Sequence, residues 1–158
     1  MIDLSNNAAG AVDEADLLGL ATFLMSALGM SADAELSIAL VDEDEMERLH
    51  REWLGEPGPT DVLSFPMDEL VEPTVGESAV TGVLGDVVLC PSVAARQARS
   101  GDCQAEMRVL LTHGVLHLLG HDHSDQAAGR AMFARQAELV AAYERSATDP
   151  ARDPAGTS

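Results

Sequence analysis

Three histidines in residues 113–123 constrain this chain more than any other feature, because they form the pattern His-x-x-x-His-x-x-Gly-x-x-His. His113 and His117 are four residues apart, so their side chains project from one face of an α-helix. Gly120 can take the left-handed backbone conformation that ends a helix and folds the chain back. The pattern therefore predicts a helix and a turn that bring His123 beside the first two histidines.

Three neutral imidazoles about 2.0–2.1 Å from one ion, with a fourth position left to water, are typical of a catalytic zinc site. The residues around His113 and His117 are apolar on nearly every side, which predicts a buried helix. Histidines inside a core are costly unless they ligate or form hydrogen bonds. We therefore expect one zinc ion per chain on His113, His117 and His123, with His121 as the alternative ligand.

The spacing of the histidines is also that of the metzincin proteases, which differ at one decisive position. In those enzymes a glutamate follows the first histidine and acts as the general base. Here the residue is Gly114, which has no side chain. A zinc metallopeptidase stays an alternative function, weakened by this glycine.

Two further motifs accompany the histidines: Pro59-Thr-Asp-Val-Leu-Ser-Phe-Pro66 and Leu84-Gly-Asp-Val-Val-Leu-Cys90. In this order and at these separations, the three motifs resemble the YbeY family of bacterial ribosomal-RNA maturation factors, from about Ser37 to Tyr143. The resemblance implies a metal-dependent endoribonuclease, specific for single strands, that acts in ribosomal-RNA maturation, including the 3′ end of 16S rRNA, and in ribosome quality control. It also carries the metal-ligand role onto the three histidines.

The chain departs from the family at an arginine that is assigned a role in RNA cleavage. Many members have this arginine just after an aromatic residue, upstream of the Pro-Thr-Asp motif. Here the aromatic residue is Trp53, and Leu54 follows it. We predict that Arg51, and secondarily Arg48, borders the metal cleft and takes part of the missing role.

Several other polar residues are candidates for the site. Asp86 interrupts an apolar strand, so it is a candidate for catalysis or for a structural role as an acceptor of backbone N–H groups. Asp86, Asp122 and Asp125 are also the expected acceptors for the ligands' second ring nitrogens. We interpret Ser64 as a strand-end residue without a catalytic partner, and His50 as a surface residue of a helix.

The charge of the chain opposes binding to RNA. It has 27 acidic and 9 basic residues, all of the latter arginine, for a net charge of −18. Nucleic-acid-binding proteins usually gain most of their affinity by neutralising phosphates. Three arrangements would reconcile this charge with RNA: the arginines gather on one face, the acidic excess lies in mobile ends and loops such as residues 42–47 and 68–77, or a protein partner supplies the docking. A non-catalytic ribosome-assembly factor is therefore a further alternative. The expected partners are ribosomal RNA and the small ribosomal subunit, with a ribosomal protein or an assembly GTPase.

The length of 158 residues predicts one domain, which we expect at residues 1–146, with a disordered tail at 147–158. No apolar run approaches the roughly 20 residues that span a bilayer, and no secretory signal is visible, so we expect a cytoplasmic protein. Cys90 and Cys103 fit no zinc module and are expected as free thiols.

Hydrophobic periodicity and turn residues predict an α+β domain, in which a four-stranded sheet is packed by about five helices and the metal-binding helix is central. An acidic loop, long enough to be mobile, is expected at residues 67–81. The expected strands are residues 1–4, 35–41, 61–66 and 82–90, and the expected helices are residues 13–30, 91–99, 104–119, 125–145 and a segment after residue 42.

Overall fold

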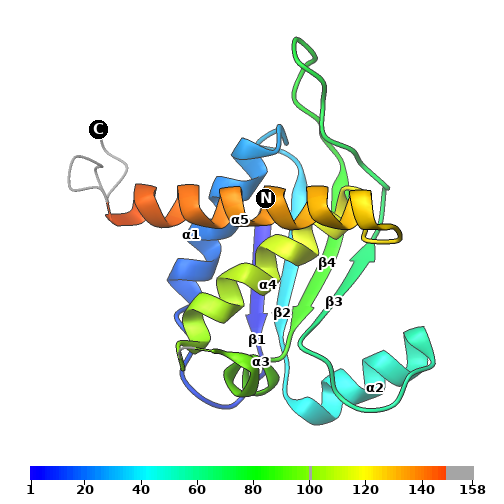
Figure 1. The fold of residues 1–158 in the computed structure, drawn as a ribbon, viewed down its shortest axis with the longest axis vertical. Helices are drawn as coiled ribbons and strands as arrows, with labels where there is room; N and C mark the ends of the chain where they lie inside the picture. Colours follow the sequence, from blue (N-terminus) through cyan, green and yellow to red (C-terminus); the bar gives the residue numbers. More distant parts are fainter. Residues whose placement is uncertain (100, 149–158) are drawn as a thin grey trace.

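The computed structural model describes residues 1–99 and 101–148, which form a four-stranded sheet with helices packed on it (Figure 1). The strands are β1 (Ile2–Asn6), β2 (Glu35–Leu40), β3 (Val62–Pro66) and β4 (Val83–Leu89). The helices are α1 (Glu14–Ala27), α2 (Glu43–Leu54), α3 (Pro91–Gln97), α4 (Cys103–Leu118) and α5 (Gln126–Thr148). The predicted α+β class, with its four strands and five helices, is confirmed.

The strand order is β1-β2-β4-β3. β1, β2 and β4 run parallel, and β3 lies antiparallel to β4 at the edge. The long connection from β3 to β4 was expected as an acidic loop. It is tied to the sheet because the Asp68 carboxylate accepts a hydrogen bond of 2.7 Å from the Val83 N–H. Glu72 in the same loop lies 3.4 Å from the guanidinium of Arg135 on α5.

Aspartates begin four of the helices. The side chains of Asp13, Asp42, Asp102 and Asp125 each accept a hydrogen bond from the backbone N–H three residues further on, at the starts of α1, α2, α4 and α5. A carboxylate at this position satisfies a free N–H group and lies at the positive end of the helix dipole. These caps explain why the helix starts were visible in the sequence.

The two faces of the sheet differ in character. On β2, Leu36, Ile38 and Leu40 are buried in the main core, beneath α1 and α4, while Ser37 points to the opposite face. Figure 1 shows α4 lying across the sheet, with α5 crossing over it. On the other face, Met46 of α2 packs in a smaller cluster with Leu63 and other apolar residues.

Helix α4 is central, as predicted, because it packs against β3, β4, α1, α3 and α5. Gly114 lies directly against the sheet. A Cβ atom there would lie 2.7 Å from Val87 Cγ1 and 3.1 Å from Ser64 Oγ. The Ser64 hydroxyl donates a hydrogen bond of 3.2 Å to the Gly114 carbonyl. The missing side chain therefore lets the helix backbone rest on β3 and β4.

The ends of the described chain refine two expectations. Helix α5 continues to Thr148, so the first two residues of the expected disordered tail are helical. The rest of that tail, residues 149–158, lies outside the described residues.

Both cysteines are free thiols, as expected. Among the helices of residues 1–99 and 101–148, none combines the length and apolar character needed to cross a membrane.

We predict that Gly114→Ala lowers the free energy of unfolding by roughly 1–2 kcal/mol, although alanine is the better helix former. Overpacking typically costs about 1–3 kcal/mol, more than the gain of about 1 kcal/mol in helix propensity. Urea denaturation would measure the change. A Val87→Ala background removes the clashing methyl group and should reduce the cost. Strict additivity of the two substitutions in a double-mutant cycle would contradict this account of the packing.

Candidate metal centre

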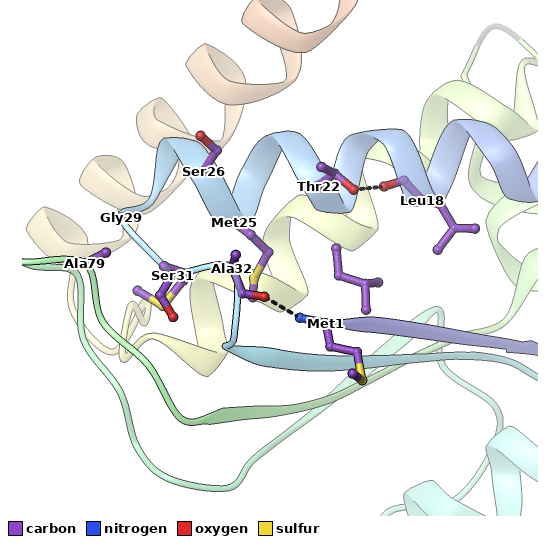
Figure 2. Close-up of a pocket in the computed structure, with 11 residues that line it drawn as sticks. Met1, Leu18, Thr22, Met25, Ser26, Gly29, Ser31, Ala32 and Ala79 are labelled. Atoms are coloured by element: carbon purple, nitrogen blue, oxygen red, sulfur yellow. Dashed lines mark hydrogen bonds between the residues drawn. The ribbon is translucent and has the colours of Figure 1, made fainter. Parts of the chain in front are cut away.

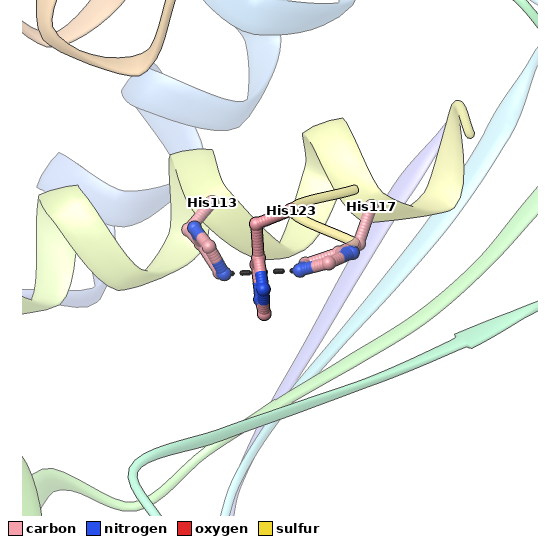
Figure 3. Close-up of side chains that lie close together, drawn as sticks. All are labelled: His113, His117 and His123. Atoms are coloured by element: carbon pink, nitrogen blue, oxygen red, sulfur yellow. Dashed lines mark hydrogen bonds between the residues drawn. The ribbon is translucent and has the colours of Figure 1, made fainter. Parts of the chain in front are cut away.

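The structure brings His113, His117 and His123 together (Figure 3), with one ring nitrogen of each within 4.8 Å of the others. No other such group of histidine, cysteine and carboxylate side chains occurs in the described part of the chain. The Nε2 atoms of His113 and His117 are 3.0 Å apart. Two ligands of one tetrahedral zinc ion would lie about 3.3 Å apart, given bond lengths of about 2.0–2.1 Å. These three imidazoles can therefore hold a metal ion.

The turn that carries His123 has the geometry predicted from Gly120. This glycine has a φ of 92°, in the region that favours glycine, directly after α4 ends. The turn then rests on α5 at Gly129, where an added Cβ would lie 3.3 Å from His123 Cβ. Asp125 begins α5 by accepting a hydrogen bond of 2.8 Å from the Ala128 N–H. Two glycines and a helix cap thus place the third histidine.

Gln136 on α5 holds the ring of His113 in place. This role of Gln136 was not predicted from the sequence. Its Oε1 atom lies 2.8 Å from His113 Nδ1. Because an amide oxygen can only accept, Nδ1 carries the proton and Nε2 is left free to bind a metal. The expected carboxylates are used elsewhere: Asp122 accepts from Ser124, and Asp125 caps α5. Gln136 is a polar residue in the apolar stripe of α5, which was a visible signal.

Burial keeps His117 in the form that binds metal. The pKa of His117 is lowered from its ordinary value, first by burial and then by the charges of His113 and His123. A lowered pKa favours the neutral imidazole, whose lone pair is the ligand. His117 is therefore ready to bind a cation at neutral pH.

Asp86 lies away from the histidines. Its neighbour Val87 contacts Gly114 of α4, and successive residues of a strand point to opposite faces. Asp86 pairs with Ser37 on β2 and Phe65 on β3, on the face that α4 does not cover. It is partly exposed, in contrast to the buried carboxylate that the apolar strand suggested. The structure therefore does not bring Asp86 to the candidate centre.

The arginines of α2 also lie apart from the centre. Arg51 pairs with Glu47 at 2.6 Å, and Arg48 pairs with Glu45 and Glu52 on the exposed surface of the helix. Neither lines the hollow at the histidines, whereas Leu54 does. The position where the family carries its arginine thus faces the site, but its side chain here is apolar.

The other histidines have separate roles. His121 lies next to the ligand turn but 4.0 Å from the Glu72 carboxylate, outside the group of three. His50 was expected on the surface, but only 13% of its side chain is exposed. Its Nδ1 lies 2.9 Å from the Gly58 carbonyl oxygen, so it ties the loop after α2 to the helix. His50 is largely covered because this loop folds back over the end of α2.

The histidines open into a hollow of about 440 Å³, which is lined by Trp53, Leu54, Asp61, Val62, Leu63, Ser64, Phe65, His113, His117 and His123. Asp61 is the one carboxylate in this lining, and its Oδ1 accepts a hydrogen bond of 2.8 Å from the Val62 N–H.

A larger hollow of about 650 Å³ lies between α1 and the start of β1 (Figure 2). Its lining has no histidine, cysteine, arginine or carboxylate side chain, so metal chemistry belongs to the histidine hollow.

The position after His113 excludes the metzincin mechanism on steric grounds. Gly114 faces the sheet, and even a Cβ atom would approach Val87 Cγ1 to 2.7 Å. A glutamate there would have to enter the packed interface between α4 and β4. The centre therefore lacks the general base that such a protease uses.

Comparisons with known proteins identify the family of the chain. The family model described as Endoribonuclease YbeY matches residues 5–144. An endoribonuclease YbeY of Thermobifida fusca is 50% identical over 153 residues, covering 96% of this chain and 99% of that protein. Another, of Cutibacterium acnes, is 50% identical over 148 residues, covering 91% and 94%. A Thermotoga maritima protein with a solution structure is 28% identical with a TM-score of 0.62, covering 97% of this chain and 100% of that chain. The chain therefore belongs to the YbeY family of endoribonucleases, hydrolases that act on RNA, as its motifs predicted.

Proposed function

We propose that this chain is a zinc-dependent endoribonuclease that cleaves single-stranded ribosomal RNA during maturation, including the 3′ end of 16S rRNA, and in ribosome quality control. The observation that carries the proposal is the group of three histidines, whose ligand atoms lie within 4.8 Å of one another. Family membership supports the choice of RNA as substrate. We place the activity in the cytoplasm, where ribosomes are assembled.

In this proposal each residue of the centre has a separate task. His113, His117 and His123 hold the ion, and Gln136 fixes the ring of His113 through its Nδ1 proton. A zinc ion held there would lower the pKa of a water molecule toward about 7 and could polarise a phosphoryl oxygen. Leu54 and the aromatic ring of Trp53 form an apolar wall of the hollow.

The distribution of charge supports a protein partner in docking. Five arginines, at positions 48, 51, 96, 108 and 135, already pair with acidic side chains of the chain itself. These arginines are therefore poorly placed to neutralise phosphates across a broad surface. We propose that a ribosomal protein or an assembly GTPase of the small subunit brings the RNA to the centre. A non-catalytic assembly factor would not need the hollow beside the histidines, whereas a nuclease would bind its substrate there.

We predict that His117→Ala loses most of its zinc, whereas His121→Ala keeps about one ion per chain. The reason is that His117 lies in the group of three and His121 lies outside it. Elemental analysis of protein purified under identical conditions would measure the zinc content. Retention of zinc in His117→Ala together with loss in His121→Ala would reassign the ligand.

We predict that zinc affinity is constant near neutral pH and falls as the pH drops below about 6, because a protonated imidazole cannot ligate. The lowered pKa of His117 moves its own protonation to a lower pH than that of a free histidine. Zinc retention against a fixed concentration of chelator, measured across pH, tests this. A content unchanged down to about pH 5 would argue against histidine ligands.

We predict that the zinc-loaded protein cleaves single-stranded RNA, while double-stranded RNA and casein stay intact. His113→Ala should lose the cleavage, since it removes a ligand, and it controls for contaminating nucleases. Gel analysis of labelled substrates separates the three proposed functions. Degradation of casein would favour a peptidase, and inactivity toward every substrate would favour a non-catalytic assembly factor.

A further inference from the structure

Two exposed aromatic side chains border the histidine centre. The chain has five aromatic residues, and only Trp53 and Phe133 expose more than half of their side chains, at 63% and 53%. Trp53 lines the same hollow as the three histidines. Phe133, on α5, has its ring centroid 5.9 Å from that of His113 and 6.4 Å from that of His123. Both exposed rings therefore lie at one site.

Each of the two rings packs against other rings of the chain. Trp53 meets the ring of Phe65 edge-on, with centroids 5.9 Å apart. Phe133 lies nearly parallel to His113 and His123, at interplanar angles of 24° and 16°. Single exposed apolar residues are common on protein surfaces and need no explanation. Two supported rings beside one candidate metal centre are a different case, because supported rings lose little conformational freedom on binding a flat ligand.

A cation lies beside one of these rings. Arg130 lines a shallow hollow that also includes Phe133 and His123. Among residues 1–99 and 101–148 no acidic side chain forms an ion pair with Arg130, whereas its neighbour on α5, Arg135, pairs with Glu72. Arg130 is therefore placed to meet a phosphate close to the histidines.

We propose that Trp53 and Phe133 stack the bases of single-stranded RNA on either side of the histidine centre, and that Arg130 contacts a phosphate of the same strand. The inference rests on the proposed nuclease function and specifies how the substrate is held. Stacking suits this chain because base faces are uncharged, so the net charge of −18 does not oppose it. It also gives a reason for selecting single strands, since paired bases in a helix do not offer their faces.

Trp53 allows a direct test because it is the only tryptophan of the chain. A short single-stranded 2′-O-methyl RNA oligomer, shown by gel to stay intact, would be titrated into zinc-loaded protein at low salt. A base that stacks on the indole should quench its emission. An abasic oligomer with the same phosphates should leave the emission unchanged and bind roughly tenfold more weakly or worse. Equal binding of the two oligomers, or no binding of either, would overturn the proposal.

Substitutions separate the rings from the cation. Phe133→Leu should weaken binding of the base-carrying oligomer by roughly tenfold while Phe133→Tyr, which keeps the ring, should not. Leu18→Ala, at an exposed apolar residue lining the hollow of Figure 2, is the remote control. Arg130→Gln should weaken the binding of both oligomers alike. Arg99→Gln, at an exposed position two residues after α3 ends, should weaken neither. Anisotropy of a labelled oligomer gives the affinities, and zinc content and thermal unfolding show that each variant is intact.

The outcomes distinguish this inference from the proposed function. Cleavage of RNA with no quenching of Trp53, and with full activity in Phe133→Leu, would overturn the stacking inference alone. Absence of cleavage in the zinc-loaded parent would overturn the nuclease function, whatever the oligomers do. A tenfold loss of cleavage in Arg51→Ala but not in Arg130→Gln would overturn the role of Arg130 and support the sequence-based prediction for Arg51.

Discussion

The contact between Gly114 and the edge of the sheet supports the rest of the site. It sets the height of α4 above β3 and β4, because no side chain separates the helix backbone from Val87 and Ser64. The same contact fixes how α4 is turned about its own axis, because the helix face that carries Gly114 must point toward the sheet. His113 and His117 are then turned toward the hollow between α4, β3 and the end of α2. A single glycine thus links the packing of the core to the position of two candidate ligands.

Local signals in the sequence were sufficient where the physics is local. Histidines four residues apart and a glycine after the helix each act within a turn or two of the chain. The structure shows the effect of this glycine in the positive φ of Gly120. The alternation of residues 35–41 also predicted the strand β2, in which buried residues alternate with more exposed ones.

The positions of the other candidate residues depend on contacts between distant parts of the chain. Gln136 reaches His113 only because α5 crosses α4, and no spacing rule within either helix encodes that crossing. Asp86 sits among apolar residues, but the register of β4 with β2 and β3 decides which face it occupies. Arg51 is near the position of the missing arginine in the sequence, but an ion pair with Glu47 on the same helix engages its guanidinium.

Gln136 has an electrostatic consequence for the centre. A histidine ligand is commonly held by a carboxylate, which adds a negative charge beside the metal. The amide of Gln136 fixes the ring of His113 with no formal charge, and neutral imidazoles add none. The full charge of a bound divalent cation would therefore face the hollow. In a chain with three times as many acidic as basic residues, a cation held at the centre would itself attract a phosphate.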